Sequence, residues 1–279
     1  MDATEFRRRS RAVWEAMAPG WDSRHAYFEE VARPVIDLML KRLAPEPGQT
    51  ILDLAAGTGV AGFAAAGVVG GEGHVIVSDF AERMVDAAKR HAATVGLTNV
   101  ECRVLDAEQL DLADDAVDGV ICRWGYMLMA DPAAAFHETR RVLRPGGRLA
   151  FAVFTAPEEN PWGALPAAVL VERGHMPPPE AGAPGLFALA DRSRLSQLLT
   201  QAGFSEPRFE DVAFTWRFAD QDAFWTFLRE AAGAITIVLD RLDDHERLRV
   251  GQEIRERVEA FDGPNGIELQ GVSLVASAT

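Results

Sequence analysis

The sequence predicts an α/β fold with a doubly wound, mostly parallel sheet, and two observations carry that prediction. Short apolar segments alternate with helical segments between residues 50 and 154. These apolar segments lack a strict polar–apolar alternation, as expected for strands that are covered on both faces. Because crossovers between parallel strands are right-handed, elements in this order wind into a Rossmann-like sheet with helices on both sides.

The elements follow in a regular order along this region. The expected strands are residues 50–55, 74–79, 100–105, 117–123 and 148–154. The expected helices between them are residues 60–69, 81–96 and 132–143, and an Arg-Pro-Gly-Gly turn at 144–147 leads into the fifth strand. Further along, the pattern predicts a helix at 191–202 capped by Asp191, an alternating strand at 206–218 and a final strand at 267–277.

The segments outside this alternation are predicted to form a cover over the sheet. Residues 1–48 are expected to form a helical N-terminal cap, and residues 49–279 the core domain. Two stretches of the core domain, at about 155–190 and 220–261, read as lid insertions; the first is rich in Pro, Gly and Ala, and the second is helical.

The charge and composition of the chain make several classes of protein function unfavourable. The net charge of −14 disfavours a nucleic-acid partner, because such binding depends on Lys and Arg displacing counterions. Two cysteines, Cys102 and Cys122, read as buried free thiols, and no paired-cysteine or zinc spacing predicts a metal. The charged, amphipathic start is unlike a signal peptide, and no run is apolar enough to insert in a membrane. A cytoplasmic location is therefore expected.

A glycine-rich loop follows the first expected strand. Gly57-x-Gly59-x-x-Gly62 separates that strand from a helix, and Asp79 stands at the end of the second strand. Glycines let the backbone approach a ligand closely, and an acid in the position of Asp79 can accept hydrogen bonds from ribose hydroxyls. The arrangement predicts a nucleoside-containing ligand.

Asp53, at the end of the first strand, helps to separate NAD from S-adenosylmethionine. A buried carboxylate needs a partner, and it suits a cationic ligand better than a pyrophosphate. S-adenosylmethionine carries an ammonium group and a positive sulfur. The alternative is that Asp53 only accepts hydrogen bonds from loop amides, and both roles can hold together.

Five segments together resemble the class I S-adenosylmethionine-dependent methyltransferases, within the group that includes ubiquinone and menaquinone biosynthesis enzymes. They cover roughly residues 50–155, in family order and spacing. The segments are 51–59 (ILDLAAGTG), 77–84 (VSDFAERM), 105–108 (LDAE), 117–124 (VDGVICRW) and 140–149 (RRVLRPGGRL). Ala55 stands where the family usually has its first glycine. The resemblance also implies a seventh strand, placed antiparallel between the fifth and sixth, which residues 267–277 would supply.

The resemblance implies a set of cofactor-binding residues. Asp79 would bind the ribose hydroxyls, Phe80 and Met84 would pack on the adenine, and Asp106 and Ala107 would meet its edge. Arg123 could face the methionine carboxylate with a bidentate fork, or pair with a nearby acid. Ordinary packing is the alternative for Phe80 and Met84, and a turn cap for Asp106. The full set is Trp21, Asp53, Ala55, Gly57, Gly59, Asp79, Phe80, Met84, Asp106, Ala107 and Arg123.

Methyl transfer is an in-line displacement at carbon, so the protein mainly aligns the acceptor and excludes water. Where a base is needed, His25 is the candidate, because its Trp-Asp-Ser-Arg-His segment resembles N-terminal segments that lie over the cofactor. Aromatic residues in the cap and lids suit a flat or lipophilic small-molecule acceptor, or alternatively a homodimer contact. A non-catalytic S-adenosylmethionine-binding protein and an NAD-dependent oxidoreductase are the alternative functions.

Overall fold

The computed structural model describes residues 3–180 and 182–279; residues 1–2 of the predicted cap and residue 181 of the first predicted lid lie outside the described residues. Its centre is one sheet, which in the described residues has eight strands. The strands are β1 Thr50–Leu54, β2 His74–Asp79, β3 Val100–Val104, β4 Val117–Arg123, β5 Leu143–Phe154, β6 Arg208–Phe218, β7 Asp262–Gly263 and β8 Gly266–Ala278. The predicted α/β fold is therefore confirmed.

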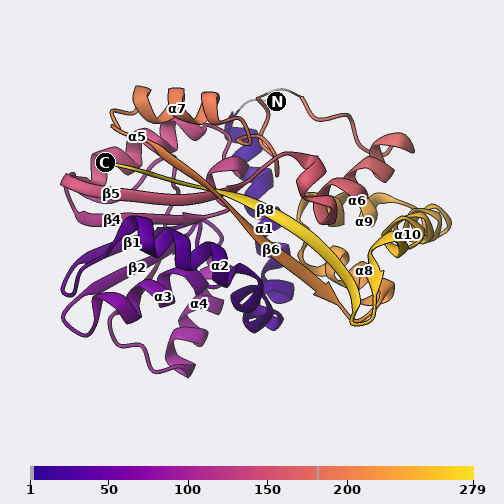
Figure 1. The fold of residues 1–279 in the computed structure, drawn as a ribbon, viewed down its shortest axis with the longest axis horizontal. Coiled ribbons are helices and arrows are strands. Elements are labelled where there is room, and N and C mark those ends of the chain that lie inside the picture. The colour runs from indigo at the N-terminus through magenta and orange to yellow at the C-terminus, as the bar shows by residue number, and fades with distance from the viewer. Residues whose placement is uncertain (1–2, 181) are drawn as a thin grey trace.

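Helices cover both faces of the sheet and one of its ends. The α-helices are α1 Ala3–Ser23, α2 His25–Leu43, α3 Val60–Val69, α4 Glu82–Thr94, α5 Pro132–Val142, α6 Pro161–Glu172, α7 Arg192–Gln201, α8 Gln221–Ala231, α9 Ala234–Arg241 and α10 Asp244–Val258. In Figure 1, α3 and α4 lie on one side of the sheet, and α5 and α7 on the other. Helices α6, α8, α9 and α10 gather at the right-hand end (Figure 1). Within the described chain, no helix is both long and apolar enough to cross a membrane.

The strand order is β3-β2-β1-β4-β5-β8-β6, with the short β7 beside β8. Strands β1 to β5 are mutually parallel, whereas β8 runs antiparallel to both β5 and β6. This confirms the expected antiparallel strand between the fifth and sixth strands. The order reverses between β1 and β4, and ligands of such sheets bind at the carboxyl ends of the strands near that reversal.

The predicted Arg-Pro-Gly-Gly turn is a bulge inside β5 instead. Val117 of β4 pairs with Leu143, and two residues later Gly119 pairs with Arg148, so residues 144–147 are accommodated as extra residues on β5. Gly146 has a φ of +80°, a conformation that favours glycine. Because β5 pairs with β4 both before and after this bulge, β5 starts at Leu143, five residues before the predicted start.

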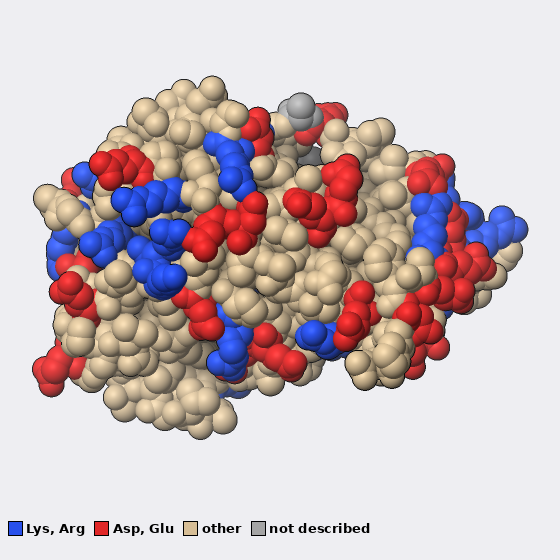
Figure 2. All heavy atoms as spheres, viewed as in Figure 1, with Lys and Arg blue, Asp and Glu red and all other residues tan. Residues whose placement is uncertain are grey.

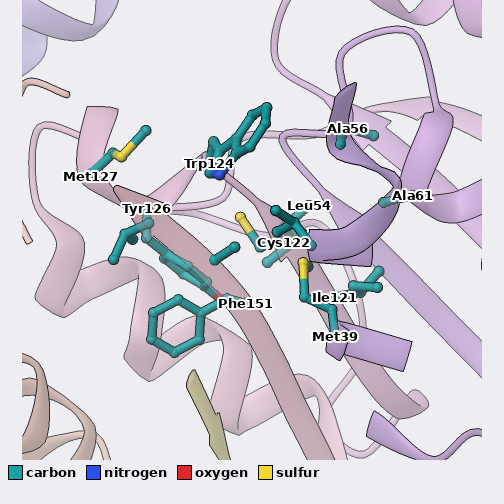
Figure 3. Packing of buried hydrophobic residues seen from close by; sticks show 14 of the residues in the cluster. Met39, Leu54, Ala56, Ala61, Ile121, Cys122, Trp124, Tyr126, Met127 and Phe151 are labelled. Carbon is teal, nitrogen blue, oxygen red and sulfur yellow. The ribbon is translucent and has the colours of Figure 1, made fainter. Parts of the chain in front are cut away.

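Buried side chains hold the loop that follows β4 in place. Cys122, Tyr126 and Phe151 lie together in the core (Figure 3). The Tyr126 ring stacks on Phe136 of α5 at 4.2 Å, and its hydroxyl is 2.6 Å from the Thr139 hydroxyl. These contacts anchor the segment that leads from β4 to α5 along the edge of the sheet. Cys122 is a buried free thiol as predicted, whereas Cys102 is only half-buried.

Candidate active site

A pocket with about 750 Å³ of free space, open in part to solvent, lies at the carboxyl ends of β1, β2, β3 and β4. Four strand-end loops form its floor and walls, and α1 covers it. The lining residues are Phe6, Arg7, Ser10, Trp14 and Trp21 of α1, then Ala55, Gly57, Asp79, Phe80, Leu105, Asp106, Ala107, Glu108, Arg123, Trp124, Gly125, Leu128, Met129 and Ala130. The pocket therefore forms where the strand order reverses.

The glycine loop turns tightly between β1 and α3. Ala55, Gly57 and Gly59 have φ values of +51°, +57° and +93°. Ala55 adopts this left-handed conformation without being glycine, so the pocket stores some backbone strain where the family usually has a glycine. A Cβ on Gly62 would lie 2.6 Å from Val77 Cγ2 and 2.9 Å from Asp53 Oδ2, so this glycine allows α3 to pack closely on the sheet.

Asp79 joins two of the pocket loops. Its Oδ2 accepts a hydrogen bond from the Gly57 N–H at 3.0 Å, and its Oδ1 accepts one from the Ala81 N–H at 2.9 Å. Burial raises the pKa of Asp79 to about 6, although both amides act in the opposite direction. Asp79 lines the pocket and holds the backbone of the glycine loop at the same time.

Two buried charged residues on neighbouring strands keep atoms without partners. Asp53 Oδ2 accepts from the Gly62 N–H at 2.6 Å, but within the described chain Oδ1 has no hydrogen-bond partner. The Arg123 Nε and Nη1 atoms have none there either, and the guanidinium lies 4.5 Å from the Trp124 ring centre. Burial raises the pKa of Asp53 to about 7 and lowers that of Arg123 to about 10. Unpaired buried donors and acceptors are unfavourable and suggest a ligand with both signs of charge.

The far side of the pocket is built after β3. Asp106 Oδ1 accepts from the Glu108 N–H at 3.0 Å, the turn cap that was the alternative role for this residue. Glu108 in turn accepts from the Ala130 N–H at 2.8 Å and lies 3.5 Å from Arg7 of α1. Glu108 thus ties three pocket segments together. It stands in the Leu-Asp-Ala-Glu motif, but its role was not predicted from the sequence.

Trp21 closes the pocket over the glycine loop. Its Nε1–H donates to the Ala231 carbonyl of α8 at 3.1 Å, and its ring stacks on Phe28 at 4.1 Å. A Cβ on Gly57 would lie 3.4 Å from the Trp21 ring. The residue therefore covers the glycine loop and connects it to the helical end of the molecule.

Four predicted site residues, Asp53, Gly59, Met84 and His25, do not line the pocket. Gly59 lies deeper in the glycine loop, and Met84 is fully buried in a small cluster with Met17 and Ala18. His25 Nδ1 lies 2.9 Å from the Thr58 hydroxyl, and its ring stacks on His91 at 3.8 Å. Burial, and next the charge of His91, lower the pKa of His25 to about 4.

Of the α1 residues that line the pocket, only Trp21 was predicted from the sequence. Phe6, Ser10, Trp14 and Trp21 all line it. Their spacing of four, four and seven residues places them on one face of a helix, which is the signal that could have identified them. Leu128 and Met129 were also missed, because the segment after β4 carries no periodic pattern.

The residues present fit a ligand with a nucleoside at one end and a zwitterionic group at the other. Among the lining residues, Phe80, Asp106 and Ala107 can face a base, Asp79 a ribose, and the unpaired Arg123 atoms a negative charge. The unpaired Oδ1 atom of Asp53, buried just outside the lining, suits a positive charge. Fold and pocket therefore define a Rossmann-like enzyme that binds a nucleoside-containing cofactor.

Comparison with known proteins identifies the family. A methyltransferase-domain family matches residues 45–173. The chain is 34% identical over 185 residues to the demethylmenaquinone methyltransferase of Clavibacter sepedonicus, covering 59% of this chain and 69% of that protein. It is 41% identical over 116 residues to the arsenite methyltransferase of Halobacterium salinarum, a match that spans 41% of this chain but only 30% of the relative.

A solved structure, that of a proposed methyltransferase from Bacillus halodurans C-125, has the same fold with a TM-score of 0.60 and 20% identity over 87% of this chain and 97% of that one. The chain belongs to the class I S-adenosylmethionine-dependent methyltransferases. S-adenosylmethionine is the cofactor of this class.

Proposed function

We propose that this chain transfers a methyl group from S-adenosylmethionine to a flat, largely apolar small molecule. The observation that carries the proposal is the pocket itself, whose lining includes Asp79, Phe80, Asp106 and the unpaired atoms of Arg123. The unpaired Oδ1 atom of Asp53 is buried just outside this lining. When bound, the cofactor supplies a methyl group on a positively charged sulfur. The names of the relatives, a menaquinone-precursor and an arsenite methyltransferase, support a small-molecule acceptor.

Each pocket residue has a proposed task. Asp79 accepts hydrogen bonds from the ribose hydroxyls, Phe80 packs on the base, and Asp106 and Ala107 meet the base edge. Asp53 Oδ1 faces the ammonium group of the cofactor, and Arg123 forms the bidentate contact with its carboxylate. The assignments of Asp53 and Arg123 use atoms that have no hydrogen-bond partner in the described chain.

The cover excludes water and orients the acceptor. Trp14 and Trp21 pack edge to face at 5.6 Å above the glycine loop. Rate acceleration by alignment and desolvation requires such a dry, fixed site. We propose that His25 acts by holding the Thr58 hydroxyl of the loop, in place of the role as base that the sequence suggested, because it bonds Thr58 and lies outside the pocket lining.

The setting of the enzyme is also a proposal. We infer a cytoplasmic protein that acts on a small-molecule acceptor, has no nucleic-acid partner, does not insert in a membrane and can form a homodimer. Lys and Arg side chains do gather at the left of the face in Figure 2, away from α6, α8 and α10. A hollow lined by Lys41, Arg42, Arg148 and Arg208 exists among the described residues, but Arg42 pairs there with Glu210.

Calorimetry tests the cofactor assignment directly. S-adenosylmethionine, S-adenosylhomocysteine and NAD are titrated in parallel into the purified protein. Micromolar binding of both adenosyl ligands without NAD binding is expected. Transfer of radiolabelled methyl to any member of a panel of flat phenols, ketones and thiols then separates the enzyme from a non-catalytic binding protein. Binding of NAD alone would overturn the proposal.

A further inference from the structure

Buried side-chain nitrogen and oxygen atoms without a hydrogen-bond partner belong, within the described chain, to only four residues. They are Asp53, Arg123, Trp162 and Trp216. The proposed function accounts for the first two. The two indole N–H groups have no assigned role, and a buried tryptophan normally finds an acceptor for its N–H. Leaving such a donor unpaired is unfavourable, so these two groups need an explanation.

The two tryptophans meet between the sheet and the helical cover. Trp216 lies on β6 and Trp162 on α6, and their ring centres are 4.8 Å apart. Their exposed fractions are 2% and 6%. Phe154 of β5 packs edge to face on Trp162 at 5.1 Å. Phe227 of α8 lies 5.2 Å from Trp216. Aromatic rings from both predicted lids and from the sheet therefore surround the two unpaired donors.

This aromatic cluster adjoins the cofactor pocket. Trp124 lines the pocket, and its ring centre is 6.2 Å from that of Trp216. The Arg123 guanidinium lies 4.5 Å from the ring centre of Trp124 and 5.9 Å from that of Trp21. The cluster thus begins at the end of the pocket that we assign to the methionine part of the cofactor, beside which a methyl acceptor has to bind.

Tryptophans near the pocket are not generally short of partners. Trp21 donates to the Ala231 carbonyl at 3.1 Å, and Trp124 donates to the Ser273 hydroxyl at 2.8 Å. The same part of the molecule thus contains two paired and two unpaired indoles. The difference is specific to Trp162 and Trp216, and a bound acceptor atom would remove it.

We propose that Trp162 and Trp216 form the acceptor subsite and bind a flat, apolar molecule through a carbonyl or phenolic oxygen. Neutral indole donors between apolar walls suit such an oxygen better than a phosphate or carboxylate, whose desolvation these walls would not offset. Because the two rings are in contact, binding separates α6 from β6, and the ligand takes the place of the ring–ring contact. The inference rests on the proposed function only in calling this molecule the methyl acceptor.

The experiment observes the indole N–H groups directly. Protein labelled with ¹⁵N at its six tryptophans is studied by NMR, with each indole signal assigned from a single Trp→Phe variant. The probes are 1-indanone, a flat ketone, and indane, the same rings without the oxygen. Both are added to protein saturated with S-adenosylhomocysteine. Trp21 and Trp124, which are already paired, serve as internal references.

We expect the Trp162 and Trp216 signals to lie upfield of both references in the free protein and to move downfield with 1-indanone but not with indane. The ketone should bind roughly threefold to tenfold more tightly than indane, and this ratio should fall towards one in Trp162→Phe or Trp216→Phe. Trp225→Phe, altered where its ring packs on Arg255, should keep the ratio.

Indole signals that stay in place at saturating 1-indanone, or equal affinities for the two probes in the unaltered protein, would overturn the subsite. The unaltered protein decides the matter even if the Trp→Phe variants fail to fold. Failure of S-adenosylhomocysteine to bind in the same samples would instead overturn the proposed function, so the two failures can be told apart.

Discussion

The contacts that hold the strand-end loops of the sheet differ from the contacts that attach the helical cover. In the loops, carboxylates bind backbone amides, as Asp79 does with Gly57 and Asp53 with Gly62. The cover is joined through side chains, including the 3.5 Å Arg7–Glu108 pair. The carboxylates of the loops are buried, so we expect their contacts to stay closed, whereas the more exposed contacts of the cover can open and reform. The comparison indicates a rigid cofactor site beneath a cover that admits ligands. Four substitutions and one pH-dependence experiment test it.

The largest effect is expected from Gly57→Val. Gly57 has a φ of +57°, and its new side chain would meet the Trp21 ring, whose atoms lie 3.4 Å from the Cβ position. Cofactor affinity should fall by roughly a hundredfold or more, equivalent to about 2.8 kcal/mol. Calorimetry with S-adenosylhomocysteine measures this loss.

Gly48→Val is the matched control for Gly57→Val. Gly48 also has a positive φ, of +85°, but nothing lies within 4 Å of its Cβ position. Both variants should lose stability from the left-handed backbone, by roughly 1–2 kcal/mol. Only Gly57→Val should lose the cofactor. Equal affinities in the two folded variants would mean that the loop is not the cofactor site.

Asp79→Ala should follow in size. It removes the proposed contact with the ribose and frees the amides of Gly57 and Ala81. Each lost charge-assisted hydrogen bond is worth about 1.5–3 kcal/mol, or roughly a tenfold to hundredfold loss of affinity. Asp86→Ala, an exposed change on α4, is the control. Unchanged affinity in folded Asp79→Ala would contradict the assignment of the ribose site.

These two predictions concern residues that the sequence identified, and the reason is physical. Glycines with positive φ and an acid at the end of a buried strand are local features, so β2 and β4 have the predicted bounds and Asp79 lies in the pocket. The position of the Met84 side chain depended instead on how α4 is rotated about its axis. In the structure this side chain packs in a buried cluster with Met17 of α1.

The contacts between the cover and the sheet could not be predicted from local sequence patterns. Glu108 binds Ala130 and Arg7, which are 22 and 101 residues away in the sequence. The pairing of His25 with Thr58 spans 33 residues. Such partners are set by the packing of α1 and α2 over the sheet, so the existence and composition of the cover could be predicted from the sequence, but its contacts could not.

Binding of the cofactor should release protons near pH 6 to 7. Burial raises the pKa of Asp53 to about 7 and that of Asp79 to about 6, both from 3.8. A raised carboxyl pKa means that the fold favours the protonated form. The stability from these groups is therefore complete below about pH 3.8 and declines as the pH rises through 6 to 7.

A ligand whose ammonium group faces Asp53 and whose ribose hydroxyls donate to Asp79 favours the ionised form of both acids. Calorimetry of S-adenosylmethionine binding near pH 6, in two buffers of different ionisation enthalpy, should therefore show proton release that disappears by about pH 8.5. Equal heats in the two buffers near pH 6 would mean that neither acid ionises on binding. That result would remove the proposed role of Asp53.

His25→Ala distinguishes a positioning residue from a base. Loss of the contact with the Thr58 hydroxyl should weaken cofactor binding by roughly twofold to tenfold. His25→Asn should restore part of that affinity, and the pH profile of methyl transfer should keep its shape. A catalytic base would instead lose roughly a hundredfold or more in turnover with cofactor affinity intact.

The smallest effect is expected from weakening the attachment of α1 to α4. Residue Ala81 caps α4 without a side-chain hydrogen bond, and Glu15 of α1 accepts instead from the N–H groups of Glu82 at 2.6 Å and Arg83 at 3.1 Å. A carboxylate at a helix N-terminus also interacts favourably with the helix dipole. The cover thus completes the helix that follows Asp79 and Phe80 of the pocket.

Glu15→Ala should cost about 1 kcal/mol, which lowers the Tm by roughly 2–4 °C in a chain of this size. If α1 opens as a cover, the variant should also release S-adenosylhomocysteine faster in stopped-flow fluorescence of the tryptophans, and Glu15→Gln should show less of both effects. Glu30→Ala, an exposed change on α2, is the control. A lowered Tm with unchanged release would mean that the contact with α4 is structural and that cofactor exchange does not require α1 to detach.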